Sequence, residues 1–266
     1  YKAGIGRATA LAFATAGCSG LALADVNEEG LEATMKLIKD LPGVTCNVQL
    51  YTMDVLSLES VQATYKSVRA TFGRLDYQVD SHGLRMEQVR VGDSPDVPLE
   101  SFDYQNNILY RGVWLCHREA LRIMRDQTLD CEAYPSAGIH PARAQRGAIV
   151  TVNAGQAIAA LSGMSTYSAA KSAVLGLVRG AAVDNAKARI RLNAVLPGTV
   201  DTTAIKNTGE MSNYLEDQFV KKTPFQRKGM PEEIADLIVF LASNKASWTS
   251  GASYLIDGGV AASGDL

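Results

Sequence analysis

A chain of 266 residues, 47% of them hydrophobic, has room for one large α/β domain or two small ones around a substantial core. Its net charge of −2 excludes the basic surface of a typical nucleic-acid-binding protein and a polybasic membrane anchor. The sequence contains no apolar run of about 18 residues and no signal peptide, so we expect no membrane partner and a cytoplasmic location.

Cysteines and histidines are spread along the sequence. The four cysteines, at positions 18, 46, 116 and 131, form no close-spaced pair. We expect them to be reduced thiols of a cytosolic protein, not a disulfide framework or a zinc site. The histidines are equally scattered, at positions 82, 117 and 140, which argues against a histidine-based metal centre. The sequence therefore predicts that no metal is bound.

The first predicted element is a helix that begins at Gly4-Ile5-Gly6 and ends near Gly17. Glycines at a helix start let the backbone approach a pyrophosphate, and the helix N-terminus offers N–H groups and a positive dipole to it. We predict that this segment binds the phosphates of a dinucleotide.

A short apolar strand over 21–25 follows, and we expect it to be buried. Its last residue, Asp25, lies about twenty residues after the glycines, where a carboxylate can accept hydrogen bonds from an adenosine ribose. The same carboxylate would repel a 2′-phosphate, so Asp25 favours NAD over NADP. The alternative is an ordinary solvated acid at a strand end.

Further along, the apolar pattern predicts helices and strands in alternation, over 28–39, 45–55, 57–72, 75–83 and 101–125. Ser57 is the expected N-cap of one helix. Gln78 and Asp80 are unusual in a central strand, because buried polar groups need partners. The long connection over 126–146 is expected to be functional or disordered.

The middle of the chain carries the strongest candidate for catalysis. A β-branched run predicts a buried strand over 148–153, and a helix begins near Ser165. Tyr167 and Lys171 are four residues apart and therefore neighbours on one helix surface. An ammonium beside a phenol lowers the phenol's pKa, so Tyr167 is a candidate general acid or base. The same spacing also occurs by chance without function.

The last third predicts strands over 190–196 and 253–256 and a helix over 231–241. The charged segment over 203–228 has the composition of a mobile helical lid over a substrate cleft. Alternation of strands and helices predicts an α/β fold: a doubly wound parallel sheet with helices on both faces, in three layers.

Four segments, in order across nearly the whole chain, resemble the short-chain dehydrogenase/reductase family: GIGRATALAFATAG, TYSAAKSAVLGLVR, LPGTVDT and YLIDGG. The resemblance implies a single Rossmann-like domain over 1–266 that binds NAD or NADP. It also implies catalytic roles for Tyr167 and Lys171. The cofactor-binding residues that follow are Gly4, Ile5, Gly6, Asp25, Asp54, Val55, Gly83, Tyr167, Lys171, Pro197, Gly198, Val200 and Thr202.

Individual roles also follow from the resemblance. Asp54 and Val55 match the pair that contacts adenine. Val200 and Thr202 match the loop that holds the carboxamide and phosphate on the nicotinamide side. Lys171 is expected to hold the nicotinamide ribose.

The sequence departs from the family at several catalytic positions. The family's serine, about thirteen residues before the tyrosine, falls on Ala154 or Gly155, with Asn153 or Gln156 as possible substitutes. Its catalytic asparagine falls on Leu109, while Asn106 and Asn107 lie about a turn earlier. The motif Asn-Asn-Ala-Gly survives only as Gly83, and His82, in the alanine position, is either a drifted strand end or a replacement catalytic group. The family's first strand would precede Tyr1, so we expect a gap in the middle of the sheet.

These observations favour an NAD(P)-dependent oxidoreductase that moves a hydride between nicotinamide and a carbonyl or alcohol of a small apolar or aromatic metabolite. One alternative is a redox-impaired family member that performs isomerisation, dehydration or cyclisation in secondary metabolism. Another is a non-catalytic binding protein on the same fold. The resemblance further implies a homodimer or homotetramer formed through helices 101–125 and 162–185, with Trp114 as a contact.

Overall fold

The computed structural model describes residues 4–85, 88–202, 220–221 and 223–263. Its strands are β1 (Gly20–Asp25), β2 (Asn47–Thr52), β3 (Tyr77–Asp80), β4 (Gly147–Val152), β5 (Ile190–Pro197) and β6 (Ser253–Ile256). Its α-helices are α1 (Ile5–Thr15), α2 (Glu28–Lys39), α3 (Leu58–Phe72), α4 (Leu99–Asn106), α5 (Val113–Arg125), α6 (Asp130–Ala133), α7 (Ser165–Asn185), α9 (Pro231–Ala242) and α10 (Val260–Ser263).

All strand pairs are parallel, and they form two sheets with the orders β1-β2 and β3-β4-β5-β6. Among the described residues, β1 pairs only with β2 and β3 only with β4, which confirms the expected gap in the middle of the sheet. The gap leaves β1 half-buried, whereas β4 and β5 are buried along almost their whole length. The expectation of a buried strand over 21–25 was therefore wrong, because burial there requires a neighbour on both edges.

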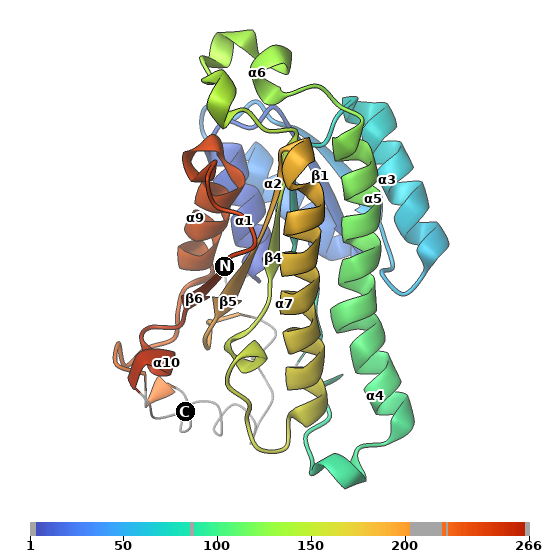
Figure 1. Ribbon diagram of the computed structural model, residues 1–266, viewed down its shortest axis with the longest axis vertical. Helices are drawn as coiled ribbons and strands as arrows, with labels where there is room; N and C mark the ends of the chain where they lie inside the picture. The colour runs from blue at the N-terminus through green and yellow to red at the C-terminus, as the bar shows by residue number, and fades with distance from the viewer. Residues whose placement is uncertain (1–3, 86–87, 203–219, 222, 264–266) are drawn as a thin grey trace.

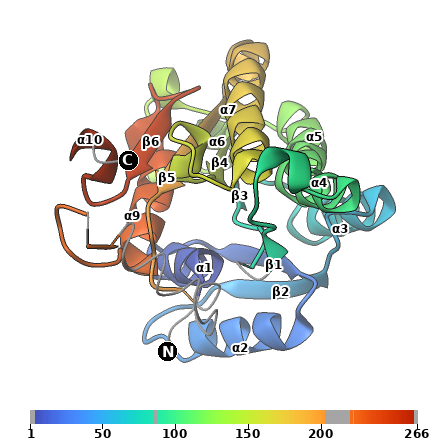
Figure 2. The ribbon, with the colours of Figure 1, turned by 90° about the horizontal axis from the view of Figure 1, so that it is seen from below.

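Helices cover both faces of the larger sheet, as Figures 1 and 2 show. On one face, side chains of α5 and α7 pack with those of β4 and β5 in one apolar cluster. On the other face, α1 and α9 pack against the same two strands. The three-layer α/β architecture is thus confirmed, and its core lies on both sides of β4 and β5.

Local signals place the helix starts well. Asn27 caps α2 by accepting a hydrogen bond from the Gly30 N–H, and Ser57 caps α3 in the same way through the Ser60 N–H. Gly73, with φ of 75°, ends α3 in the left-handed conformation that glycine tolerates best.

The helix predicted over 101–125 is interrupted. It consists of α4, a π-helical segment over Asn107–Gly112, and α5. Such widened turns often occur at functional sites. Gly112 in this segment lies against Val55: an added Cβ would come within 3.0 Å of the valine side chain. The close approach explains why a glycine is required at this bend.

The connection over 126–146 is ordered. We expected a loop that is either functional or disordered, and the expectation of disorder was wrong. The connection contains α6 and is anchored by Asp130, whose carboxylate accepts hydrogen bonds from the Gln145 N–H (3.0 Å) and from Asn244 Nδ2 (2.9 Å). Asp130 and Gln145 are buried. The segment therefore closes the end of the molecule above α7, as Figure 1 shows.

A buried arginine in β5 holds the end of α9. Arg191 donates hydrogen bonds to the carbonyls of Leu241 (2.8 Å), Ala242 (2.9 Å) and Ser243 (3.1 Å). These carbonyls have no partner within the helix, and Arg191 satisfies them from the neighbouring strand. Within the described ranges, every helix is too short or too polar to cross a lipid bilayer.

The central gap gives a first prediction. A strand-forming segment added before Tyr1 is expected to raise the melting temperature, because it can pair with the unpartnered edges of β1 and β3. A contribution of about 2 kcal/mol would shift the midpoint by roughly 4–8 °C in a protein of this size. A Gly/Ser segment of equal length is the control in a thermal melt, and equal midpoints for the two extensions would contradict the prediction.

Candidate active site

Parallel strands end at one edge of the sheet, and the polar candidates gather there. Asp25 ends β1, Asp80 ends β3, Asn153 follows β4, and Pro197 ends β5. The chain crosses the central gap between β2 and β3, which is the switch point where open α/β sheets bind ligands. Figure 2 shows α7 beside β3 and β4 in this region.

Tyr167 and Lys171 lie in the first turns of α7. The Lys171 Nζ is 5.7 Å from the centroid of the Tyr167 ring. Lys171 is 6% exposed and Tyr167 is partly buried. The predicted neighbourhood of ammonium and phenol is therefore confirmed, in a site shielded from water.

The expected depression of the Tyr167 pKa is not found. Burial raises the pKa of Tyr167 to about 12, and burial lowers the pKa of Lys171 to about 8. The physical reason is that desolvation disfavours the charged forms of both groups. In this state Tyr167 holds its proton at neutral pH and is an acid.

The family's serine position offers no donor in the described structure. Ala154 is 7% exposed, and its side chain is a methyl group. Asn153 uses one of the two N–H groups on its Nδ2 to donate to the Lys171 carbonyl (2.9 Å), and its Oδ1 only accepts. This hydrogen bond fixes α7 to the end of β4. Gln156 lies in the short helical turn that follows and is partly buried.

The asparagine position is apolar as well. Leu109 lies in the π-helical segment and is 1% exposed. Asn106 Nδ2 donates to the Phe102 carbonyl of its own helix (2.9 Å), and Asn107 is exposed. Neither asparagine replaces the missing amide from its position in this structure.

The start of α1 has the features of a phosphate cradle. Its first turn contains no acidic residue, and no side chain of the described residues caps it, so its N–H groups have no such partner there. A Cβ added to Gly4 would have no atom within 4 Å, whereas one added to Gly6 would meet the Ser81 Oγ at 2.5 Å. Packing therefore demands glycine at Gly6, and the space at Gly4 is open to a ligand beside Ile5.

Asp25 is exposed at the end of β1, and one carboxylate oxygen accepts a hydrogen bond from the Asn27 N–H (3.0 Å). Arg7 on α1 is held by α2: its Nε donates to the Thr34 Oγ1 (3.0 Å).

The other predicted cofactor contacts lie in loops at the strand ends. Asp54 is exposed and accepts a hydrogen bond from the Leu56 N–H (2.9 Å), and Val55 packs with the α3–α5 cluster. Gly83 follows β3 with open space beside its Cα. Both loops leave room for a ligand at the edge of the sheet.

The loop after β5 is shaped by packing. A Cβ on Gly198 would lie 2.9 Å from Asp257, so glycine is needed there for close contact with the turn after β6. Val200 bridges to Gly229, and the Thr202 N–H donates to the Val200 carbonyl (2.8 Å). Of the predicted lid over 203–228, residues 203–219 and 222 lie outside the described residues.

A buried polar network occupies the end of β3. Gln78 Nε2 donates to Asp80 Oδ1 (2.9 Å), and the Tyr65 hydroxyl donates to Gln78 Oε1 (2.7 Å). His117 Nε2 lies 3.0 Å from Asp80 Oδ2 and 2.9 Å from the Thr151 Oγ1. Gln78 and Asp80 thus have the hydrogen-bond partners that their burial requires. The spacing of residues in the sequence did not reveal His117 on α5 as one of these partners.

His82, two residues after Asp80, is partly buried. Burial lowers the pKa of its imidazole, although the Asp80 carboxylate opposes the shift. The charge of Lys171 contributes in the same direction as burial, so His82 lies within electrostatic range of Lys171.

Two cysteines meet although they are distant in sequence. The Sγ atoms of Cys18 and Cys46 are 3.5 Å apart, where the turn after α1 approaches the start of β2. This separation exceeds a disulfide bond of about 2.05 Å, so both are thiols here. The parallel pairing of β1 with β2 brings these two cysteines together. Their spacing in the sequence did not indicate this contact.

This chain is similar to known proteins along nearly its whole length. Residues 1–261 match the family model described as enoyl-(acyl carrier protein) reductase. The chain is 33% identical over 263 residues to the short-chain dehydrogenase srdC of Neurospora crassa, covering 96% of this chain and 93% of that protein. It is 29% identical over 257 residues to the 3-oxoacyl-[acyl-carrier-protein] reductase FabG of Thermotoga maritima, covering 97% of this chain and 93% of that protein.

A solved structure is similar over the same extent. The crystal structure of levodione reductase has a TM-score of 0.83 to this chain at 30% sequence identity, covering 97% of this chain and 94% of that one. The likeness thus spans both sheets and the helices on both faces, including α7, where Tyr167 and Lys171 lie.

Proposed function

Because this chain belongs to the short-chain dehydrogenase/reductase family, whose members are NAD(P)-dependent oxidoreductases, we propose that it reduces a carbonyl or oxidises an alcohol of a small apolar or aromatic metabolite. The observation that carries this proposal is the Tyr167–Lys171 pair, held in a desolvated site at the carboxyl ends of the strands. A protonated phenol there can supply a proton to a developing alkoxide.

The chain's own residues fit a dinucleotide along the edge of the sheet. The N-terminus of α1, with Gly4 open beside it, suits the pyrophosphate, and Asp25 suits the adenosine ribose. Asp54, Val55 and Gly83 are proposed at the adenine side, and Pro197, Gly198, Val200 and Thr202 at the nicotinamide side. When bound, the nicotinamide exchanges a hydride with the substrate carbon.

Lys171 is proposed to act twice in that complex. Its ammonium would contact the nicotinamide ribose and support the phenolate that forms when Tyr167 gives up its proton. Asn153 positions this lysine by donating to its backbone carbonyl. Tyr167 is then the only proton donor proposed at the reacting oxygen.

A second candidate is a redox-impaired enzyme that uses the same cleft for isomerisation, dehydration or cyclisation. It is favoured by the methyl side chain at Ala154 and the buried Leu109, which remove two polar groups of the family's catalytic set. Loss of one preorganised donor costs roughly 10²–10³ in rate at comparable sites.

The test is titration with NAD and NADP by calorimetry, followed by a panel of ketones, aldehydes and alcohols with absorbance at the reduced nicotinamide. Binding with turnover supports the oxidoreductase. Binding without turnover favours the redox-impaired enzyme, and no binding favours a non-catalytic protein on the same fold.

Cofactor choice gives a second prediction. NAD is expected to bind more tightly than NADP, and Asp25→Ala is expected to weaken NAD about tenfold, since a charged hydrogen bond contributes about 1.5–3 kcal/mol. The same change removes the repulsion of a 2′-phosphate, so the preference for NAD over NADP is expected to become smaller. Glu32→Ala on the exposed face of α2 is the control, and tighter NADP binding by the unmodified chain would overturn the assignment of Asp25.

A third prediction concerns the hydrogen-bond donor that is missing at the family's serine position. Ala154→Ser is expected to raise turnover of a ketone substrate by about 100-fold, because it places a hydroxyl where negative charge develops. Gly155→Ser is the comparison, because an added Cβ there would meet only the Pro197 carbonyl at 3.7 Å. Unchanged turnover in both variants would mean that the chemistry does not use a donor at this loop.

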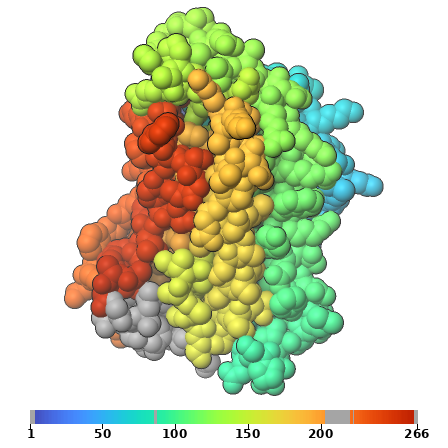
Figure 3. Space-filling view, in the orientation of Figure 1, coloured from blue at the N-terminus to red at the C-terminus, as the bar shows by residue number. Residues whose placement is uncertain are grey.

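Assembly is proposed to be a homodimer or homotetramer through α4, α5 and α7, with a cytoplasmic location. Large apolar side chains stand exposed along α4 and α5, among them Phe102, Tyr110 and Trp114. In Figure 3 these helices and α7 share one broad face of the molecule. Such a row supports contact with a second copy.

A further inference from the structure

Three side chains of metal-binding chemistry converge at the end of β3. Asp80 ends the strand, His82 follows it, and Cys116 comes from α5. One ligand atom of each lies within 4.8 Å of the other two. Asp80 is 5% exposed and Cys116 is 1% exposed. Two of the three stand where the family has asparagine and alanine, and the proposed redox function uses none of them.

The imidazole of His82 lacks a partner that its burial demands. Its Nε2 is buried and has no hydrogen bond within the described residues. The Ile108 backbone hydrogen-bonds the ring. A bare buried nitrogen is rare and calls for a water molecule or an ion.

Each of the three side chains has a supporting contact behind it. Gln78 Nε2 donates to Asp80 Oδ1 (2.9 Å), and His117 Nε2 lies 3.0 Å from Asp80 Oδ2. The Tyr65 hydroxyl hydrogen-bonds the Cys116 thiol. Metal ligands in proteins are oriented by such outer contacts, and a ligating histidine commonly donates its other N–H to a backbone carbonyl.

We propose that Asp80, His82 and Cys116 form a binding site for one zinc ion. The set of one oxygen, one nitrogen and one sulfur is typical of zinc. Bond lengths of about 2.0–2.3 Å place tetrahedral ligand atoms roughly 3.3–3.8 Å apart, so the ligand atoms must approach one another by up to about 1.5 Å. A water molecule completes the fourth position.

Charge and proton balance are consistent with burial. The carboxylate of Asp80 and the thiolate of Cys116 together neutralise Zn²⁺. Binding breaks the S–H bond, forms the Zn–S bond and releases one proton to solvent, with no change in oxidation state. His82 binds as the neutral imidazole.

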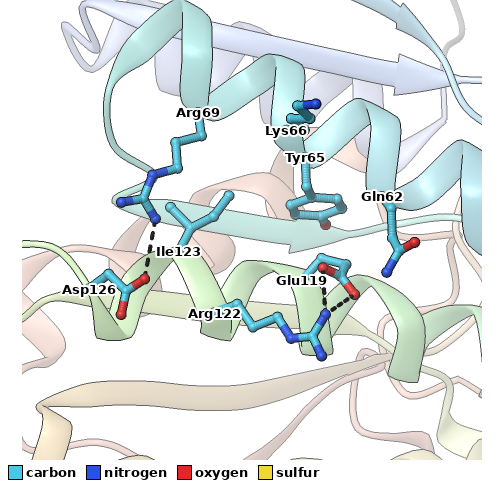
Figure 4. A pocket seen from close by; sticks show the side chains of 8 residues that line it. All are labelled: Gln62, Tyr65, Lys66, Arg69, Glu119, Arg122, Ile123 and Asp126. Carbon is cyan, nitrogen blue, oxygen red and sulfur yellow. Dashed lines mark hydrogen bonds and ion pairs between the residues drawn. The ribbon is translucent and has the colours of Figure 1, made fainter.

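The surface provides a route to the site. Figure 4 shows a hollow between α3 and α5, flanked by the ion pairs Arg122–Glu119 and Arg69–Asp126. Tyr65 lines this hollow, and its hydroxyl contacts Gln78 and Cys116. Tyr65 therefore lines the hollow and also contacts the site, and rotation of this side chain is the route that we propose for the ion.

Zinc binding is measured on the full chain without cofactor or substrate, so the result is independent of the redox proposal. The chain is stripped with a chelator, titrated with Zn²⁺, desalted and analysed by elemental mass spectrometry. We expect one zinc per chain and a higher melting temperature with zinc. Substitution by Co²⁺ is expected to give the visible bands of a tetrahedral site and a sulfur-to-cobalt charge-transfer band.

Variants locate the ion. His82→Ala and Cys116→Ser are expected to weaken zinc binding at least 100-fold and to abolish the charge-transfer band, with circular dichroism checking that both fold. His140→Ala and Cys131→Ser, outside the cluster, are the matched controls and should retain the metal. Absence of stoichiometric zinc in the unmodified chain, or equal zinc in all variants, would overturn the site.

Discussion

Replacing Tyr167 by phenylalanine is expected to lower kcat for carbonyl reduction by at least 100-fold. Phenylalanine keeps the shape of the ring on α7 and removes the only proton donor proposed at the reacting oxygen. General acid catalysis by a positioned side chain contributes about 10²–10⁴ in rate. The measurement is steady-state turnover with the substrate that the panel identifies, with cofactor affinity measured beside it.

Tyr110→Phe is the matched control, because Tyr110 is exposed on the π-helical segment and its hydroxyl has no proposed role. Cofactor affinity is expected to change little in Tyr167→Phe, since the loss concerns proton transfer. Turnover that survives this substitution would place the chemistry elsewhere, and His82 and Asp80 would then be the first residues to replace.

Replacing Lys171 by methionine is expected to abolish turnover and to stabilise the protein at neutral pH. The side chain is 6% exposed, and burial lowers the pKa of Lys171 from 10.5 to about 8. At 1.36 kcal/mol per pKa unit, keeping the ammonium charged in this site costs up to about 3 kcal/mol at pH 7. Methionine fills a similar volume without that cost.

The pH dependence has a definite sign. Between pH 8 and 10.5 the unfolded chain keeps a proton on Lys171 that the folded chain has released, so the free energy of unfolding rises with pH in this window. Burial raises the pKa of Tyr167 from 10.0 to about 12, so stability falls again between pH 10 and 12. The stability gain of Lys171→Met is therefore largest below pH 8 and vanishes near pH 10.5.

Urea denaturation at pH 7, 8, 9 and 10 measures both effects in the wild type and in Lys171→Met. Lys36→Met, at an exposed position on α2, is the control and should show no such pH-dependent difference. A variant that is less stable than the wild type at pH 7 would mean that Lys171 is paired in solution and carries no net cost of burial.

The proximity of Tyr167 and Lys171 could be predicted from the sequence because both residues lie on one helix. Lys171 lies four positions after Tyr167, and an α-helix places residues with this spacing on one face whatever surrounds it. The cap Ser57 acts on the residues immediately after it, and it was predicted correctly for the same reason.

Protonation within that pair could not be predicted from spacing. Spacing indicates that an ammonium lies near a phenol, but the pKa depends on how much water the surrounding fold removes from each group. Burial by neighbouring elements outweighs the attraction in this structure and shifts the two pKa values in opposite directions. The π-helical widening before α5 likewise depends on packing, here of Gly112 against Val55.

By itself the sequence determined the order of strands and helices and the residues offered at the strand ends, because these follow from local periodicity and the parallel α/β plan, whereas the central gap was expected from the family resemblance. Only the tertiary structure decided which distant side chains meet: Cys18 with Cys46, Arg191 with the carbonyls after α9, and Asp80 with His117. Those contacts join segments far apart in the chain. Their distances depend on strand register and helix packing, which no local pattern encodes.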